Sequence, residues 1–397
     1  MTAGAARPEG LAEGPVEDDQ HRFKGHFSGF GGRVYLDCAA QGPFPRDTSD
    51  EVRRALRYKE HPEEIPETLS EDLPDRARAA LARLIGCKPA SVALGSGASH
   101  GINIAARGLP LRAGDEVLLP QGEFPANLFP WLALREDGIR VRMVPCSSGR
   151  HVTAEDLVAA ITPATRAISV SLVAFATGYR IDLKMIGEAC RRSDLFLVVD
   201  GAQGIGSIDF RVADHPIDIL AVSGYKWLLG PYGCGFTYVN PRILDRLRVV
   251  DVNWLGVEGA GRQDRRAGYD LRFKEGARRF DTPETASFLN VSALAASAEF
   301  IGRVRVSTIE SHVRRLIDRL VPSIERTRLR LVSDLAPARR SAIVSFEGPT
   351  LDDTRTIYRR LRDKGVVVSL RENLIRVSPH IYNTPDDIDL FLSAAIG

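Results

Sequence analysis

The sequence lacks several features that would assign the chain to a membrane, a disulfide-bonded framework or a nucleic acid. No apolar run approaches the roughly 18 residues of a membrane-spanning helix. The five cysteines are scattered and form no C-x-x-C pair, which argues against disulfides and favours a reducing cytoplasm. The 53 basic and 51 acidic residues leave a net charge of +2, so nothing points to nucleic acid or an anionic membrane. We therefore expect a small-molecule partner.

The length of 397 residues favours two domains. The first twenty or so residues lack both the basic start and the apolar stretch of a signal peptide, and their composition is typical of a disordered leader. We assign 1–32 to a partly disordered leader, 33–275 to a large ligand-binding domain and 276–397 to a small C-terminal domain.

Strand and helix patterns alternate through the large domain. The apolar run LFLVVD (195–200) is typical of a strand covered on both faces, and Thr153 is a suitable N-cap for a following helix. This alternation predicts an α/β fold with a mostly parallel, seven-stranded sheet. Beyond residue 275 the pattern indicates a smaller α+β domain. The helices expected from periodicity include 75–85, about 287–304, about 307–327 and about 352–364.

Lys226 follows the apolar strand Ile219–Val222 and stands beside Trp227 and the glycine-rich turn GPYGCGF. An amine in such apolar, aromatic surroundings is partly desolvated and loses its proton more readily. Most lysines are solvated surface residues, but these surroundings fit a surface lysine poorly. We interpret Lys226 as a reactive amine.

Asp200 ends the strand LFLVVD and precedes Gly201-Ala202-Gln203-Gly204. Because the carboxyl ends of parallel strands face the ligand crevice, this carboxylate is expected to project into the site. A buried carboxylate needs a positive or hydrogen-bonding partner. The alternative is that Asp200 only caps the next turn.

The loop GSGASHG (95–101) lies between an expected strand and an expected helix. Small residues let the backbone approach an anion, and a helix N-terminus supplies N–H groups, so this loop could hold a phosphate. Ser99 adds a hydroxyl. Phe124 follows the next strand and could cover a flat ring, although a lone phenylalanine is more often part of the core.

Together these residues meet the requirements of pyridoxal 5′-phosphate (PLP). Lys226 would form a Schiff base with it, Asp200 would keep its pyridine nitrogen protonated, and Gln203 could contact a polar edge of its ring. Residues 95–101 would hold its phosphate. We therefore expect a PLP enzyme.

The same residues belong to a set that resembles the class V aminotransferases, a branch of the fold-type-I PLP enzymes. That branch contains cysteine desulfurases, isopenicillin-N-epimerase-like proteins and kynureninases. The resemblance covers about residues 33–395. It rests on YLDCAAQGPFP (35–45), GASHGIN (97–103), GEFPAN (122–127), VVDGAQGIG (198–206), SGYKWLLGPYGCGF (223–236) and IRVSPHIYNTPDDID (375–389).

The resemblance implies a role for each matched residue. Lys226 would carry the Schiff base and move protons, and Arg376 would bind the α-carboxylate of an amino-acid substrate through its planar guanidinium. It also implies a homodimer in which Thr282 or Thr285 reaches the partner's cofactor. The remaining expected cofactor contacts are Ala98, Ser99, Phe124, Asp200, Ala202, Gln203, Ser223 and Tyr225.

The chain also departs from the family pattern. Phe124 and Tyr225 stand where desulfurases usually carry histidines, and Phe175 replaces an expected asparagine. The segment GVVVSLRENLIR (365–376) has no cysteine, although desulfurases place their nucleophilic cysteine ahead of the arginine. We therefore expect nominally an aminotransferase, or alternatively a C–S lyase or epimerase, and no cysteine-dependent desulfurase.

Other classes remain alternatives. Residues 97–101 fit the G-x-S-x-G pattern of hydrolases, so Ser99 could act with His380 and Asp334, although no HGGG-type loop precedes it. A dinucleotide site is disfavoured because His100 stands at the third glycine. The eight histidines show no metal-binding spacing, so no metal is expected. A PLP-binding protein that has lost catalysis is a further alternative.

Overall fold

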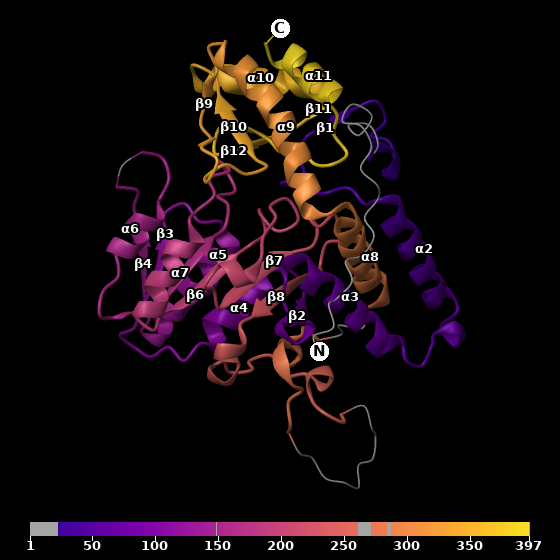
Figure 1. Cartoon of the computed structure of the whole chain (residues 1–397), viewed down its shortest axis with the longest axis vertical. Coiled ribbons are helices and arrows are strands. Elements are labelled where there is room, and N and C mark those ends of the chain that lie inside the picture. Colours follow the sequence, from indigo (N-terminus) through magenta and orange to yellow (C-terminus); the bar gives the residue numbers. More distant parts are fainter. Residues whose placement is uncertain (1–22, 148, 261–270, 284–286, 397) are drawn as a thin grey trace, which may run out of the picture.

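The computed structural model describes residues 23–147, 149–260, 271–283 and 287–396. A large sheet with its helices forms one part of the molecule, and a smaller unit with the C-terminus forms another (Figure 1). The first 22 residues of the expected leader lie outside the described residues.

The large sheet has seven strands in the order β2-β8-β7-β6-β5-β3-β4. Only β8 runs antiparallel to its neighbours β2 and β7, so the expected mostly parallel sheet is confirmed. The strands are β2 (Val92–Gly95), β3 (Glu116–Pro120), β4 (Arg140–Val144), β5 (Thr165–Ser171), β6 (Phe196–Asp200), β7 (Ile219–Ser223) and β8 (Gly235–Val239).

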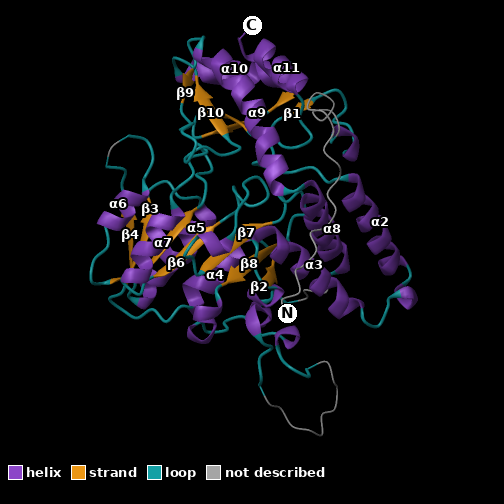
Figure 2. Cartoon of the chain, in the orientation of Figure 1, coloured by secondary structure: helices purple, strands orange, loops and turns teal. Residues whose placement is uncertain are grey.

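Helices cover both faces of this sheet (Figure 2). Neighbouring residues of β6 fall into two separate cores, with Leu197 and Val199 in one and Val198 in the other. This alternation explains the continuous apolar run in the sequence, because both faces of the strand are buried. The helices are α4 (Ala98–Gly108), α5 (Pro125–Ala133), α6 (Ala154–Ala159) and α7 (Leu183–Arg192). The predicted N-cap Thr153 begins α6 as part of a capping box with Asp156.

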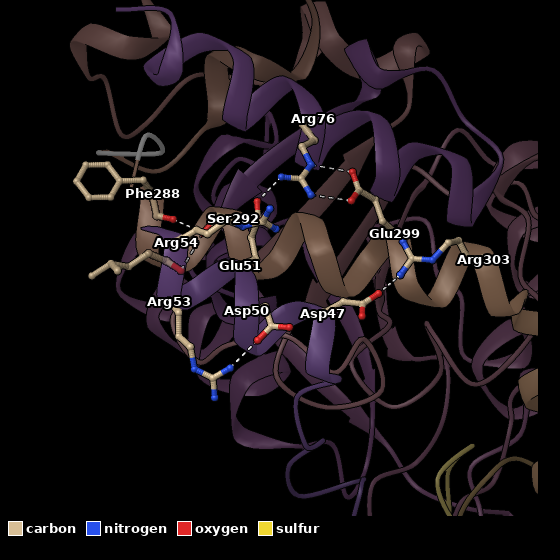
Figure 3. Close-up of polar contacts among 11 residues, drawn as sticks. Asp47, Asp50, Glu51, Arg53, Arg54, Arg76, Phe288, Ser292, Glu299 and Arg303 are labelled. Carbon is tan, nitrogen blue, oxygen red and sulfur yellow. Dashed lines mark hydrogen bonds and ion pairs between the residues drawn. The ribbon is translucent and has the colours of Figure 1, made fainter. Parts of the chain in front are cut away.

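Three helices pack together beside the sheet: α2 (Arg46–Glu60), α3 (Leu69–Ile85) and α8 (Phe288–Val304). The pattern did not predict α2, and α3 begins before the expected residue 75. Figure 3 shows the charged side chains that join them, with Arg76 bound to both oxygens of Glu299 at 2.8 Å and also to Glu51. This network ties α3 to α2 and α8.

The C-terminal unit is an antiparallel sheet covered by helices. Its strands follow the order β12-β13-β10-β9, which agrees with the expected α+β character. Its elements are α9 (Val306–Glu325), β9 (Arg330–Leu331), β10 (Val344–Glu347), α10 (Leu351–Asp363), β11 (Val366–Val367), β12 (Ser369–Arg371), β13 (Leu374–Val377) and α11 (Pro385–Ile396).

The N-terminal part of the described chain packs against this C-terminal unit. Strand β1 (Val34–Tyr35), which we had assigned to the large domain, pairs in parallel with β11. Phe27, which we had assigned to the leader, is buried, and its ring contacts Phe300 and Tyr382. Packing against the C-terminal unit therefore includes residues before position 33. Among the described residues, no helix is long and apolar enough to cross a membrane.

Candidate active site

A cavity of about 120 Å³ opens beside the carboxyl ends of β6 and β7. Nine of the predicted cofactor contacts line it, and Thr282 and Arg376 do not. The predicted residues in its wall are Ala98, Ser99, Phe124, Asp200, Ala202, Gln203, Ser223, Tyr225 and Lys226. Residues that are distant in sequence therefore meet in one place, as the strand-end argument predicts.

Lys226 follows β7 and is the cationic side chain in this wall. Burial lowers its pKa from the ordinary 10.5 to about 8, although the nearby carboxylate of Asp200 opposes this shift. Its Nζ lies 5.5 Å from the centroid of the Phe124 ring and 5.6 Å from that of Tyr225. Within the described chain, Nζ has no hydrogen bond or ion pair. A buried amine with a lowered pKa and no partner is suited to covalent chemistry.

Asp200 is buried at the end of β6 and has one oxygen available. Its Oδ1 accepts a hydrogen bond from the Ala202 N–H at 2.8 Å, whereas Oδ2 has no such partner among the described residues. Burial raises the pKa of Asp200, and the Ala202 N–H and Lys226 act against that rise. A protonated ring nitrogen would provide the missing partner.

Gln203 lies beside Asp200, but other residues orient its amide. Its Oε1 accepts a hydrogen bond from the Trp227 indole at 2.8 Å, and its Nε2 donates to the Ala39 carbonyl at 3.1 Å. One N–H of Nε2 remains to meet a ligand.

The N-terminus of α4 forms another part of the wall. Gly97 caps the helix at φ +141°, a conformation that favours glycine, and the Ala98 N–H donates to the Ser223 hydroxyl at 3.1 Å. Ser99 lines the cavity in the first turn of this helix. Backbone N–H groups and hydroxyls at a helix N-terminus suit a phosphate.

Two phenylalanines close one side of the cavity. The rings of Phe124 and Phe175 meet edge to face, with centroids 5.2 Å apart and planes at 69°. In the sequence Phe175 was notable only as a departure from the family pattern, but the structure places this residue in the cavity wall. Tyr225 stacks on Tyr232 with ring centroids 4.0 Å apart.

Sequence reasoning missed Ser171 and Glu123. Ser171 pairs in register with Asp200 on the neighbouring strand, and it lines the cavity. Its N–H and hydroxyl donate to the two carboxylate oxygens of Glu123 at 2.7 and 2.6 Å. Burial raises the pKa of Glu123 to about 7. The position of Glu123 within GEFPAN, next to Phe124, was the only available signal.

Arg376 and Thr282 lie outside the wall. Arg376 is 2% exposed, and its terminal nitrogens contact the Phe175 carbonyl at 2.9 Å and Asp37 at 3.3 Å. Thr282 donates its backbone N–H to the Leu94 carbonyl. Thr285, the other residue expected to reach a partner, lies outside the described residues. Their predicted roles stay predictions.

The residues proposed for a hydrolase triad are not assembled. His380 is buried, with its Nε2 3.3 Å from the Trp227 carbonyl oxygen, and burial lowers its pKa to about 3. Asp334 pairs with Arg339 at 3.3 Å. In the described chain, neither contacts Ser99. The described residues also contain no cluster of three or more His, Cys, Asp or Glu side chains suited to a metal ion.

This fold and cavity define a fold-type-I PLP-dependent enzyme. The Lys226 amine and the Asp200 Oδ2, which have no partner within the described part of the chain, fit the aldehyde and ring nitrogen of PLP, and the α4 N-terminus fits its phosphate. The family described as "Aminotransferase class-V" matches residues 34–391. The chain belongs to this family.

Relatives within the family carry different names. The chain is 29% identical to an isopenicillin N epimerase of Streptomyces clavuligerus, over 91% of this chain and 94% of that protein. It is 30% identical to an uncharacterized aminotransferase of Bacillus subtilis (strain 168), over 79% of this chain and 80% of that protein. Among solved structures, the cystine C–S lyase C-DES in complex with cysteine persulfide superposes with a TM-score of 0.84. It has 23% identity and covers 94% of this chain and all of that one. This last likeness concerns the fold.

Proposed function

We propose that the chain is a PLP-dependent enzyme that acts on an amino acid or a similar small amine, with Lys226 as the cofactor-bearing lysine. The observation that carries this proposal is the buried Nζ of Lys226, which has no partner among the described residues and lies in one cavity with Asp200 and the N-terminus of α4. Bound PLP would supply an electron-accepting ring for chemistry at the substrate's Cα.

Each residue has a physical task in this proposal. Lys226, with a pKa near 8, is suited to take a proton from Cα and return it close to neutral pH. Asp200 would hold the proton on the ring nitrogen. Ser99 and the first amides of α4 would bind the phosphate, and Phe124 would cover one face of the ring.

We further propose that the chemistry does not use a cysteine nucleophile. The strands β12 and β13 join through a tight turn at Glu372 and Asn373, which leaves no loop for such a residue. Among the described residues, no cysteine lines the cavity. The Sγ of Cys38 lies 3.8 Å from the Lys226 carbonyl oxygen, but Cys38 is fully buried and burial raises the pKa of its thiol. A protonated, buried thiol is a poor nucleophile.

Aminotransfer is the first candidate reaction. Epimerisation is the second, because the relative of which the chain covers 94% is named an isopenicillin N epimerase. C–S bond cleavage is a third outcome of the same proton removal. The residues in the cavity wall suit the proton step that all three reactions share.

We also propose a homodimer in a reducing compartment such as the cytoplasm. Five free thiols fit such a compartment. The large side chains of Tyr232 and Trp254 are 59% and 54% exposed, and a second copy of the chain could cover them. Light scattering on the holoprotein tests the assembly, and a monomer at micromolar concentration would refute it.

The function is tested by incubating the PLP-loaded protein with a panel of amino acids and identifying the products. Keto acids would indicate aminotransfer, and loss of optical purity would indicate epimerisation. Sulfide or persulfide would indicate C–S cleavage. The Cys38→Ser variant is the control for the cysteine argument. If sulfide release from L-cysteine occurs and disappears in this variant, the exclusion of a cysteine nucleophile is wrong.

A further inference from the structure

The loop 175–178 is attached to the C-terminal unit through four consecutive backbone carbonyls. Each carbonyl oxygen accepts a hydrogen bond from a different side chain of that unit. The pairs are Arg376 Nη1 to Phe175 O at 2.9 Å, Ser345 Oγ to Ala176 O at 2.6 Å, Ser333 Oγ to Thr177 O at 2.5 Å and Ser341 Oγ to Gly178 O at 2.7 Å.

The geometry of the small sheet explains how its side chains reach this loop. Ser345 of β10 and Arg376 of β13 are directly paired residues, so their side chains leave the same face of the sheet. The loop is also in close backbone contact with this unit. Gly178 has φ +74°, and a Cβ there would lie 2.3 Å from the Ile343 carbonyl oxygen. A larger residue at this position would force the loop and the small sheet apart.

The same loop forms part of the cofactor cavity. Phe175 lines the cavity, and its ring packs against Phe124, whose centroid is 5.5 Å from the Nζ of Lys226. A displacement of the Phe175 carbonyl would therefore disturb the ring packed against Phe124, and Phe124 is the ring that lies near the reactive amine.

Three side-chain contacts hold Arg376 in this arrangement, while its Nε has no hydrogen-bond partner among the described residues. It is 2% exposed, and its Nη2 contacts both Asp37 and the hydroxyl of Ser369 at 3.3 Å. Ser369 in turn donates to the Asp37 carboxylate, with its oxygen 2.8 and 2.7 Å from the two carboxylate oxygens. These contacts engage only Nη1 and Nη2 and leave the Nε N–H available for a further acceptor such as a substrate carboxylate, so holding the loop is a task beside any carboxylate binding.

We infer that Arg376 is a positioning residue, which fixes the loop 175–178 over the cofactor cavity and so couples the C-terminal unit to the Phe124–Phe175 pair. The inference rests on the proposed PLP function only for its effect on the cofactor. The attachment of the loop is a property of the protein with or without PLP.

Two variants test this inference. Arg376→Ala removes the contact to Phe175, and Ser345→Ala removes the neighbouring contact to Ala176 with a minimal change in volume. Hydrogen exchange is measured at the amides of Ala174 and Gly178, which are bonded within the loop turn at 2.9 and 2.8 Å. We expect exchange to accelerate roughly tenfold or more in Arg376→Ala and severalfold in Ser345→Ala. Arg376→Lys, which can still reach one carbonyl, should restore part of the protection.

The second readout is the visible circular dichroism of bound PLP without substrate, which reports the asymmetry around the ring. A positioning role predicts an altered signal in both alanine variants, in the same direction and smaller for Ser345→Ala. A role limited to binding the substrate's carboxylate predicts an unchanged signal and unchanged exchange in both, with only the KM of Arg376→Ala raised. That result would overturn the inference.

The design keeps the two proposals apart. If the wild-type protein gives no visible PLP signal, the proposed function fails, and the exchange measurement on the cofactor-free protein still tests the loop attachment. If Arg376→Ala does not fold, Ser345→Ala carries the test alone, since it leaves the Asp37–Arg376 pair intact. Unchanged loop exchange in Ser345→Ala would then count against the inference.

Discussion

Two buried sites with opposite charges in this protein differ in how completely the surrounding side chains and backbone pair those charges. Arg78 and Asp281 are 2% and 5% exposed and form two hydrogen bonds of 3.0 and 2.7 Å. Asp281 also accepts the Leu94 N–H, and Arg78 also donates to the Val92 carbonyl. Asp200 and Lys226 are as deeply buried, at 5% and 8%, yet one carboxylate oxygen and the amine have no partner among the described residues.

The comparison teaches that burial alone does not distinguish a structural charge from a functional one. Leaving a buried charge unpaired costs several kcal/mol, roughly 3–5 in proteins where a partner was removed. Arg78 and Asp281 neutralise each other within the chain, although the Arg78 Nε has no hydrogen-bond partner among the described residues. The Asp200–Lys226 region would avoid that cost when a ligand supplies the missing partners.

The largest expected effect on stability is at the Arg78–Asp281 pair. Arg78→Ala should lower the free energy of unfolding by about 3–5 kcal/mol, because Asp281 would stay buried without its counter-ion. Urea unfolding of the cofactor-free protein measures this change. The folded fraction should still bind PLP with an unchanged spectrum. A loss below about 1 kcal/mol would remove the contrast between the two sites.

The largest expected effect on activity is at Asp200, whose Oδ2 has no hydrogen-bond partner among the described residues. Asp200→Ala should reduce turnover by about 10²–10³-fold, a typical cost of removing one preorganised electrostatic contact, while PLP stays attached to Lys226. The same variant should not lower the unfolding free energy of the cofactor-free protein, since it removes a buried carboxylate with an incomplete hydrogen-bond set. Full turnover in Asp200→Ala would show that the ring nitrogen is held elsewhere.

The pH dependence of cofactor attachment sharpens the comparison further. Only the neutral amine of Lys226 can react, and its pKa is lowered from 10.5 to about 8. The rate at which the visible band appears on mixing with PLP should therefore rise through a midpoint near pH 8 and level off at higher pH. Arg371→Ala removes a positive charge that lowers this pKa, so its curve should shift to higher pH. A midpoint near 10.5 in the wild-type protein would contradict the desolvated environment of Lys226.

The smallest expected effect is at the phosphate loop. Ser99→Ala removes one hydroxyl from a site that keeps the helix N-terminus and Ser223, so PLP affinity should fall by about threefold to tenfold. Equilibrium dialysis against PLP measures the loss. Complete loss of an esterase activity in Ser99→Ala would instead revive the hydrolase alternative.

Much of the large domain could be predicted because its signals are local. The strand β6 follows from a short run of apolar residues that are buried on both faces of the sheet. The start of α6 follows from hydrogen bonds between Thr153 and a residue three positions later. The expected long helices were also found, as α8, α9 and α10 with bounds within a few residues. Strand ends carry Asp200 and Lys226, so the topology of a parallel sheet was enough to bring them together.

The missed features depend on tertiary contacts. Helix α2 is rich in charged residues and is held by partners on α3 and α8, such as Arg303 for its Asp47, so its own apolar stripe is weak. The extension of α3 contains Pro74, which argues against a helix in a sequence reading. The pairing of β1 with β11 joins residues more than 300 positions apart, and no local pattern encodes it.

The candidate site shows the same division. Nine of the predicted contacts gather in one cavity, because motif residues at strand ends and at a helix start meet there. The partners of Arg376 could not be foreseen. Its contacts to Asp37 and to the Phe175 carbonyl join three segments that are distant in the sequence. Every residue has a backbone carbonyl, so the amino-acid sequence does not indicate which one accepts a hydrogen bond.

The most direct test of the central claim is the visible absorbance of the PLP-loaded protein before and after borohydride reduction, followed by peptide mass analysis. The Lys226→Ala variant is the control. The account predicts a visible band in the wild-type protein that reduction bleaches, with the cofactor mass fixed on the peptide containing Lys226, and no such band or adduct in the variant. An adduct on another lysine, or no band with PLP in excess, would contradict the assignment of Lys226.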